Sequence, residues 1–175
     1  MSSLVVSSLL ETARAAAKMA QAAGADHASA GAYRSREVEI AWRDGEVEQV
    51  VEATSRSLSL GLYVDGRYSS AATSDLRPEA LKSFIEESVA MARTLAVDPH
   101  RALTDPELYA GRAQVDLQLD DPRHPTITPD DRRRLAREME EASRQARGSE
   151  HILSVATSVS DSRSESASPR RSSRR

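Results

Sequence analysis

Residues 36–73, with the sequence REVEIAWRDGEVEQVVEATSRSLSLGLYVDGRYSSAAT, decide the fold. Apolar and polar side chains alternate along most of this stretch, as in strands that have one face on a core and one face in solvent. Asp44-Gly45 and Asp65-Gly66 interrupt the alternation. Asp-Gly is typical of a type I′ turn, in which both central residues have positive φ. The stretch therefore predicts an antiparallel β-meander of four strands, which cover residues 36–43, 46–54, 57–64 and 67–73.

Two positions within the meander carry specific expectations. Trp42 shares a strand face with Val38 and Ile40, so its indole is expected in the core. Gly61 interrupts a strand of alternating leucines, which predicts either a close approach of another backbone or a β-bulge. Residues 27–34 are expected to form a further strand that leads into the meander.

An alanine-rich helix is predicted before the sheet. Ser8 and Glu11 have the spacing of a capping box, in which each side chain satisfies an unpaired backbone amide at a helix start. Residues 9–23 then favour a helix, and Gly24 stands where a C′ glycine ends one.

A second amphipathic helix is predicted after the sheet, with Ser74 or Asp75 as its cap and Pro78 in its first turn. Its apolar spacing continues for about four turns. The residues that show this spacing are Leu81, Phe84, Ile85, Ser88, Val89, Ala92 and Leu95. Two amphipathic helices packed on one antiparallel β-meander sheet predict an α+β fold.

The rest of the chain is less regular. Residues 98–127 contain four prolines and no sustained periodicity, which indicates an irregular connector. Thr128, Pro129 and the two acids after them are typical of a third helix's start. The expected apolar face of that helix comprises Leu135, Met139, Ala142 and Ala146. Residues 152–160 alternate like a further strand, but no hairpin partner follows them, so an unpaired edge is expected.

These patterns predict four regions along the chain. An α+β amino-terminal domain covers residues 1–97, and the connector covers 98–127. Residues 128–160 form a helix and a strand, which are the start of a middle region. Residues 161–175 form a disordered Ser/Arg tail.

Composition narrows the class of protein. The chain has 175 residues, no cysteine and no apolar run that approaches the ~20 residues of a membrane helix. We therefore expect no disulfides, no thiolate metal sites and no membrane partner. We expect a cytoplasmic location. The net charge is −3. Four of the last six residues are arginines, so the rest of the chain has a net charge of −7. Such an acidic body repels nucleic acid.

No catalytic, cofactor-binding or metal-binding residue is predicted. None of the histidines (His27, His100, His124 and His151) precedes a glutamate or has another histidine three to five residues away, as zinc-peptidase ligands commonly do. No Gly-x-Ser-x-Gly nucleophile elbow occurs. The carboxylates cluster at Glu37/Glu39, Glu46/Glu48/Glu52 and Glu138/Glu140/Glu141. Paired carboxylates can perform acid–base chemistry, but these lie at strand or helix-exterior spacings and are interpreted as solvated faces.

An ordered series of local phrases resembles the amino-terminal domain of the TldD/PmbA family, and within it the PmbA (TldE) branch. The phrases are AAGAD at 22–26, RDGEVE at 43–48, SLGLYVDGR at 59–67, SDL at 74–76, DPELY at 105–109 and SDSRSES at 160–166. The resemblance covers roughly residues 8–167. No single phrase is diagnostic, but their order along the chain is.

The resemblance implies a role in a metallopeptidase system that carries the older label "modulator of DNA gyrase". TldD-type and PmbA-type subunits form heterodimers that act on small or unfolded peptides. The zinc-type metal is bound by a His-Glu-x-x-x-His motif in the carboxy-terminal domain of TldD-type members, and PmbA-type members lack this motif. The chain is thus expected to contribute to peptide degradation with a TldD-type partner, and to be inactive alone.

Three alternatives remain open at this stage. The chain is a stand-alone binding or regulatory module for a TldD-type partner, a non-functional fragment from a truncated or frameshifted gene, or a nucleic-acid binder through its arginine tail. The Ser/Arg tail departs from the family's pattern and motivates the second alternative. The acidic body argues against the third. Whether the chain is itself an enzyme is left open.

Overall fold

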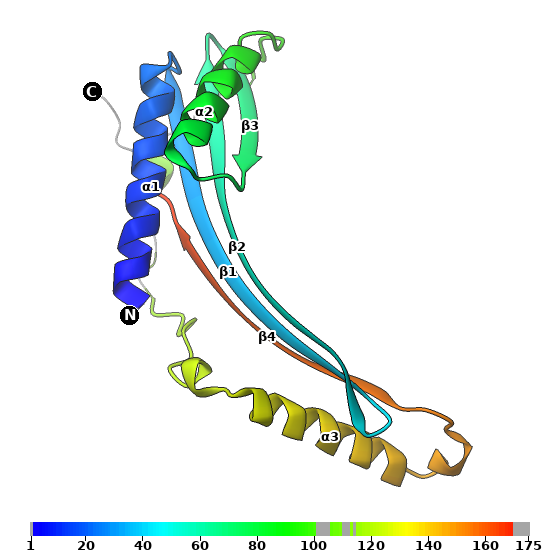
Figure 1. Cartoon of the computed structure of the whole chain (residues 1–175). Coiled ribbons are helices and arrows are strands. Elements are labelled where there is room, and N and C mark those ends of the chain that lie inside the picture. Colours follow the sequence, from blue (N-terminus) through cyan, green and yellow to red (C-terminus); the bar gives the residue numbers. More distant parts are fainter. Residues whose placement is uncertain (1, 101–105, 110–112, 114, 170–175) are drawn as a thin grey trace. The chain divides into compact units, whose positions relative to one another are not determined.

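The computed structural model describes residues 2–100, 106–109, 113 and 115–169 (Figure 1). Within these residues, the α-helices are α1 (Ser2–Ala22), α2 (Pro78–Ala92) and α3 (Pro129–Gln145). The strands are β1 (His27–Arg43), β2 (Glu46–Val64), β3 (Arg67–Thr73) and β4 (Ala156–Ala167). They form one antiparallel sheet in the order β3-β2-β1-β4. The predicted α+β class is confirmed.

Both Asp-Gly turns form as the sequence predicts. Asp44 and Gly45 have φ values of 48° and 88°, and Asp65 and Gly66 have values of 49° and 71°. Positive φ at both central positions is the condition for a type I′ turn, which matches the twist of the strands it joins. The two turns therefore fix β1, β2 and β3 as consecutive antiparallel neighbours.

The strands are longer and fewer than the four predicted between residues 36 and 73. Residues 46–54 and 57–64 belong to the single strand β2, because neither glycine nor proline lies between them to turn the chain. Likewise, the strand expected at 27–34 is the first part of β1. At Gly61 the close neighbour is a side chain rather than the predicted backbone: a Cβ atom there would lie 2.7 Å from Ser29 Oγ of β1.

The end of the sheet also differs from the prediction. β4 runs from Ala156 to Ala167. The predicted strand at 152–160 is therefore confirmed only for residues 156–160, and the predicted disorder is wrong for residues 161–167. β4 pairs with β1 on one side and is the last strand of the sheet, so among the described residues its other edge has no strand beside it, as expected. Its small hydroxylated residues are compatible with a strand once β1 satisfies the backbone. The arginines at 170–175 lie outside the described residues.

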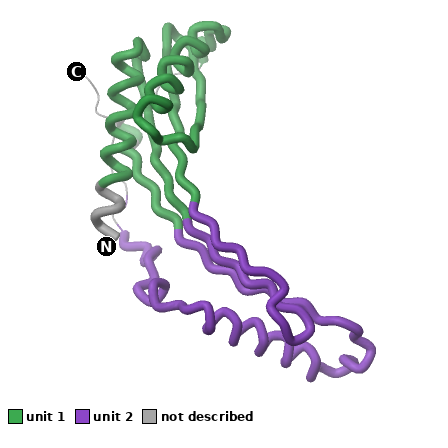
Figure 2. Tube along the Cα trace, in the orientation of Figure 1, with its two compact units in different colours: residues 1–35, 55–112, 164–175 green, residues 36–54, 113–163 purple. Residues whose placement is uncertain are grey.

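The chain divides into two compact units, coloured separately in Figure 2. Unit 1 comprises residues 1–35, 55–112 and 164–175, and unit 2 comprises residues 36–54 and 113–163. The strands β1, β2 and β4 contribute residues to both units. The division therefore runs through strands, whereas the domain boundaries predicted at 97 and 127 lie between elements.

Unit 1 contains the apolar core. Leu58, Leu60, Leu62 and Val64 of β2 are at most 2% exposed and pack with α1 and α2. Helix α1 presents small residues to this core, among them Ala13, Ala16 and Ala20, all fully buried. Small side chains let a helix lie close to a sheet, which is how a chain with 3% aromatic residues fills its core.

The end of α1 is predicted correctly and its start is not. Gly24 has a φ of 106°, and the Ala25 and Gly24 amides donate to the Ala20 and Gln21 carbonyls, the hydrogen bonds of a Schellman motif. The helix already begins at Ser2, so Ser8 lies inside it and cannot serve as the predicted cap.

Helix α2 buries the predicted stripe from Leu81 to Ala92, but Leu95 lies beyond the helix and is 41% exposed. Its N-cap is Arg77, not Ser74 or Asp75. The Asp75 carboxylate instead accepts from the Arg77 backbone amide at 3.1 Å, ahead of the first turn, and Pro78 sets the helix start.

Replacing Leu60 by alanine is expected to lower the free energy of unfolding by about 3 kcal/mol, because it leaves a cavity in the core of unit 1. The measurement is urea denaturation followed by far-ultraviolet circular dichroism. The matched control is Leu135→Ala, a leucine that is 46% exposed, for which a change below about 0.5 kcal/mol is expected. Equal losses for the two variants contradict this account of the core.

Candidate functional site

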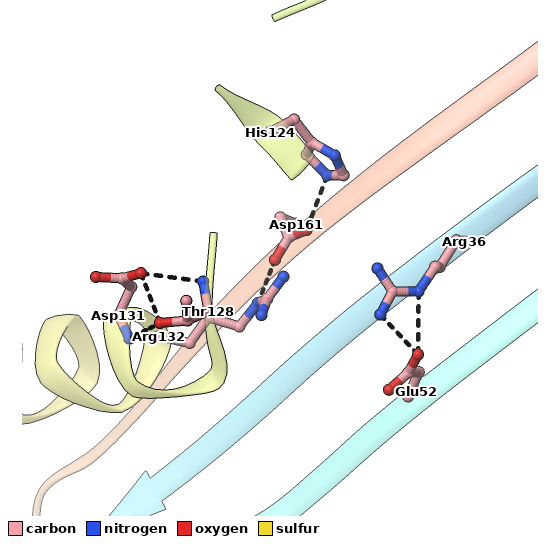
Figure 3. Close-up of polar contacts among 7 residues, drawn as sticks. All are labelled: Arg36, Glu52, His124, Thr128, Asp131, Arg132 and Asp161. Atoms are coloured by element: carbon pink, nitrogen blue, oxygen red, sulfur yellow. Dashed lines mark hydrogen bonds and ion pairs between the residues drawn. The ribbon is translucent and has the colours of Figure 1, made fainter. Parts of the chain in front are cut away.

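The candidate site lies in unit 2, where α3 packs on the sheet through charged side chains. The helix starts as predicted: the Asp131 amide donates to Thr128 Oγ1 at 3.1 Å, and the Thr128 amide donates to Asp131 Oδ2 at 3.0 Å (Figure 3). Pro129 follows the cap as the first helical residue. This capping box fixes where α3 begins, and hence which of its faces meets the sheet.

The face of α3 that packs on the sheet is not the apolar one that the sequence predicts. Leu135 and Met139 are 46% and 43% exposed, whereas Arg132, Ala136 and Glu140 are at most 5% exposed. The buried residues recur every fourth position, so they form one stripe. Two of the three are ionised, and such side chains are buried only where partners satisfy them.

The first polar network joins the start of α3 to β4. Arg132 Nε donates to Asp161 Oδ1, and His124 Nε2 lies 2.9 Å from Asp161 Oδ2 (Figure 3). The Asp161 and His124 side chains are only 18% and 19% exposed. The hydrogen bond from Arg132 and its positive charge, with a smaller contribution from His124, lower the pKa of Asp161. The sequence predicts no function for His124, and the structure places its side chain, 19% exposed, in this network.

The second network joins the end of α3 to the first hairpin. Glu140 Oε2 accepts from the Trp42 indole at 2.5 Å and from the Gly45 amide at 3.0 Å, while Oε1 accepts from Arg144 Nε at 2.8 Å. The Arg144 hydrogen bond is the main reason why the pKa of Glu140 lies below its ordinary value of 4.5. Glu140 is therefore not the solvated residue that the sequence predicts. Trp42 is half-buried with its indole N–H bonded, rather than a core residue.

Asp44 extends this second network to β4. Its carboxylate accepts from Arg144 Nη2 at 2.5 Å, from the Ser154 hydroxyl at 2.6 Å and from the Val155 amide at 3.0 Å. The Asp44 amide in turn donates to the Val155 carbonyl at 3.2 Å. The hydrogen bonds from Ser154 and Val155 are the largest causes of the lowered pKa of Asp44. A turn residue predicted only for its φ therefore also holds the segment that leads into β4.

The acids of the clusters predicted on β1 and β2 are exposed, as expected, except that Glu39 is only partly exposed. Arg43 pairs with Glu48 at 2.8 Å, and Arg36 pairs with Glu52 at 2.7 Å (Figure 3). The histidines at 27, 100 and 151 are exposed. In the described part of the chain, no three His, Asp or Glu side chains are grouped so that they could hold a metal ion. None of its helices is long and apolar enough to cross a membrane.

Within unit 2 these contacts act mechanically. Every buried charged group described above has a partner from another element, and sequence periodicity could not reveal this because each partner is distant in the chain. The arrangement fastens α3, the Asp44-Gly45 turn and β4 to one another. It thereby holds the sheet surface of unit 2 in a fixed position.

Replacing Arg132 by methionine is expected to lower the free energy of unfolding by about 3 kcal/mol, since it leaves the Asp161 carboxylate partly buried without its main partner. Urea denaturation followed by Trp42 fluorescence measures this. Arg137→Met is the matched control, because Arg137 is 57% exposed in its pair with Glu141, and a change below about 0.5 kcal/mol is expected there. A loss no larger than the control's rules out an anchoring role for Arg132.

Acid is expected to weaken the second network. A carboxylate whose pKa is lowered by folding stabilises the fold above its unfolded pKa, and this contribution is lost as the pH falls through the folded value. The urea midpoint, read from Trp42 fluorescence, should therefore drop below about pH 4.5. Glu140→Gln should make that drop shallower, whereas Glu141→Gln, at a side chain 60% exposed, should leave it unchanged. Identical pH profiles for all three proteins contradict the prediction.

Comparison with known proteins agrees with the resemblance seen in the sequence. The family model described as PmbA/TldA metallopeptidase domain 1 matches residues 28–92. The metalloprotease PmbA of Escherichia coli is 30% identical over 138 residues, which cover 79% of this chain and 30% of that protein. The chain therefore spans about a third of the length of this relative.

Solved structures give the same result. A protein of Bacteroides thetaiotaomicron, named as a presumed modulator of DNA gyrase, is 33% identical with a TM-score of 0.80, over 89% of this chain and 35% of that one. TldE of Thermococcus kodakarensis shares the fold, with a TM-score of 0.63 at 16% identity, over 90% of this chain and 34% of that one. The chain belongs to the TldD/PmbA family and contains its amino-terminal domain.

Proposed function

We propose that this chain is the amino-terminal part of a PmbA-type subunit, which processes peptides together with a TldD-type partner and carries no catalytic residue itself. The 33% identical structure with a TM-score of 0.80 is the observation that carries the proposal. The names of two similar proteins, metalloprotease PmbA and TldE, support the PmbA branch. We place this assembly in the cytoplasm.

The role of the domain in this proposal is structural. Its sheet walls the chamber that holds the peptide, and it contributes to the contact between subunits. The polar networks support this role, since they fix α3 and the first hairpin by directional hydrogen bonds rather than by apolar contacts alone. Strand edges then present backbone groups at fixed spacing, which is what an extended peptide requires.

The metal belongs to the partner in this proposal. A zinc-type ion in the TldD-type subunit supplies an activated water for peptide hydrolysis, and this chain binds no cofactor. The runner-up function, a regulatory module that docks on the same partner, differs in one respect. It changes the rate of a reaction that the partner performs without it, whereas a subunit is required for that reaction.

Co-expression with a TldD-type subunit tests the proposal. We expect a 1:1 complex by size-exclusion chromatography with light scattering, and peptide hydrolysis that a chelator abolishes. The partner alone and this chain alone should release no peptide fragments. Chelator-sensitive hydrolysis by this chain alone contradicts the proposal, and full hydrolysis by the partner alone favours the regulatory module.

A further inference from the structure

The outer edge of β2 in unit 2 is open. β3 pairs with β2 only from Leu58↔Thr73 to Val64↔Arg67, so it does not reach residues 46–54. On its other side this segment has β1. Among the described residues, no strand pairs with the outer backbone groups of Glu46–Thr54. An edge of this length is a template for an added strand.

The opposite edge of the unit 2 sheet, formed by β4, differs. The connector that precedes α3 contacts β4 twice, through Asp120 to Arg163 at 3.2 Å and through His124 to Asp161 at 2.9 Å. The side chains along the β2 edge instead include three exposed valines. These are Val47, Val50 and Val51, with 40%, 54% and 37% of their surfaces exposed.

The sheet face next to this edge, on the side away from α3, is acidic. Val38 and Ile40 are buried and Trp42 contacts α3, so alternation places Glu37, Glu39 and Arg43 on the opposite face. The ion pair between Arg43 and Glu48 brings Glu48 to that face as well, and alternation adds Glu46. Four carboxylates thus share the face with one guanidinium. Within the described residues, neither a hydrogen bond nor an ion pair engages Glu37, Glu39 or Glu46.

These charges argue against a second copy of the chain as the occupant of the edge. Two copies paired along this edge by a two-fold axis perpendicular to the sheet would place their acidic faces side by side. Repulsion between these like charges opposes that pairing. An added strand with lysine or arginine at alternate positions meets opposite charges instead.

We propose that the β2 edge at Glu46–Thr54 binds an extended basic peptide as an additional antiparallel strand. Backbone hydrogen bonds hold the peptide, its basic side chains lie over the acidic face, and the residues between them point to the opposite face of the sheet. This deepens the proposed function by giving the class of peptide, and it rests on that function for the peptide being a substrate.

The test uses the full chain and a fluorescein-labelled peptide of four Lys-Val repeats, with binding measured by fluorescence anisotropy at low and high salt. We expect binding that weakens as salt screens the charges. A Glu-Val peptide of equal length should bind at least about tenfold more weakly. So should a Lys-Val peptide methylated at alternate backbone nitrogens, because it cannot pair with the edge. Equal binding of either control, or no binding of the Lys-Val peptide, overturns the proposal.

Variants and hydrogen exchange locate the peptide. Glu46→Lys should weaken Lys-Val binding at least about tenfold at low salt, while Glu141→Lys, the same change on the exposed surface of α3, should change it less than about twofold. Circular dichroism verifies that both variants fold. The peptide should slow amide exchange at 46–54, and protection confined to 156–163 overturns the proposal.

The two proposals can fail separately. Peptide binding at the β2 edge without a complex with the TldD-type subunit refutes the proposed function and leaves the edge as a basic-peptide site. If the complex hydrolyses peptides but this chain does not bind Lys-Val repeats, only the edge site is refuted.

Discussion

The carboxylate of Glu140 is the constraint on which unit 2 depends. The Glu140 side chain is almost completely buried. An ionised group is tolerated there only when hydrogen-bond donors replace the water molecules that would otherwise solvate it. The donors come from β1 (Trp42), from the first turn (Gly45) and from α3 itself (Arg144). Because Arg144 also binds Asp44, whose carboxylate holds the segment leading into β4, one buried acid links α3 to β1, to the first turn and to that segment.

The two units are thus stabilised by different means. Unit 1 buries leucine, valine and alanine side chains, and removal of apolar surface from water drives this packing without fixing direction. In unit 2 the buried face of α3 is mainly charged, and desolvation offsets much of what each ion pair contributes. The ion pairs instead determine the position of α3, because the hydrogen bonds to Asp161 and Glu140 are satisfied in only one register of this helix on the sheet.

Local signals explain what could be predicted from the sequence. The two Asp-Gly turns, the C′ glycine Gly24 and the helix start at Thr128 each depend on neighbouring residues, and each formed as expected. The packing face of α3 could not be predicted, because periodicity treats Leu135 as buried and Arg132 as exposed. Arg132 is buried because its partner Asp161 lies on β4, and nothing near Arg132 in the sequence indicates this partner.

The sheet face of unit 2 on the side away from α3 carries acids whose lack of partners bears on function. Glu37, Glu39 and Glu46 lie on one sheet face without a cation partner among the described residues, and repulsion between charges of one sign destabilises a compact state. Arg43 and Arg36 are already paired with Glu48 and Glu52. Nothing in the internal packing of unit 2 requires the remaining acids, whereas the buried ones, Glu140 and Asp161, are each fully engaged. Carboxylates that the fold does not use are free to bind a positively charged ligand, and the basic peptide proposed for the β2 edge is such a ligand.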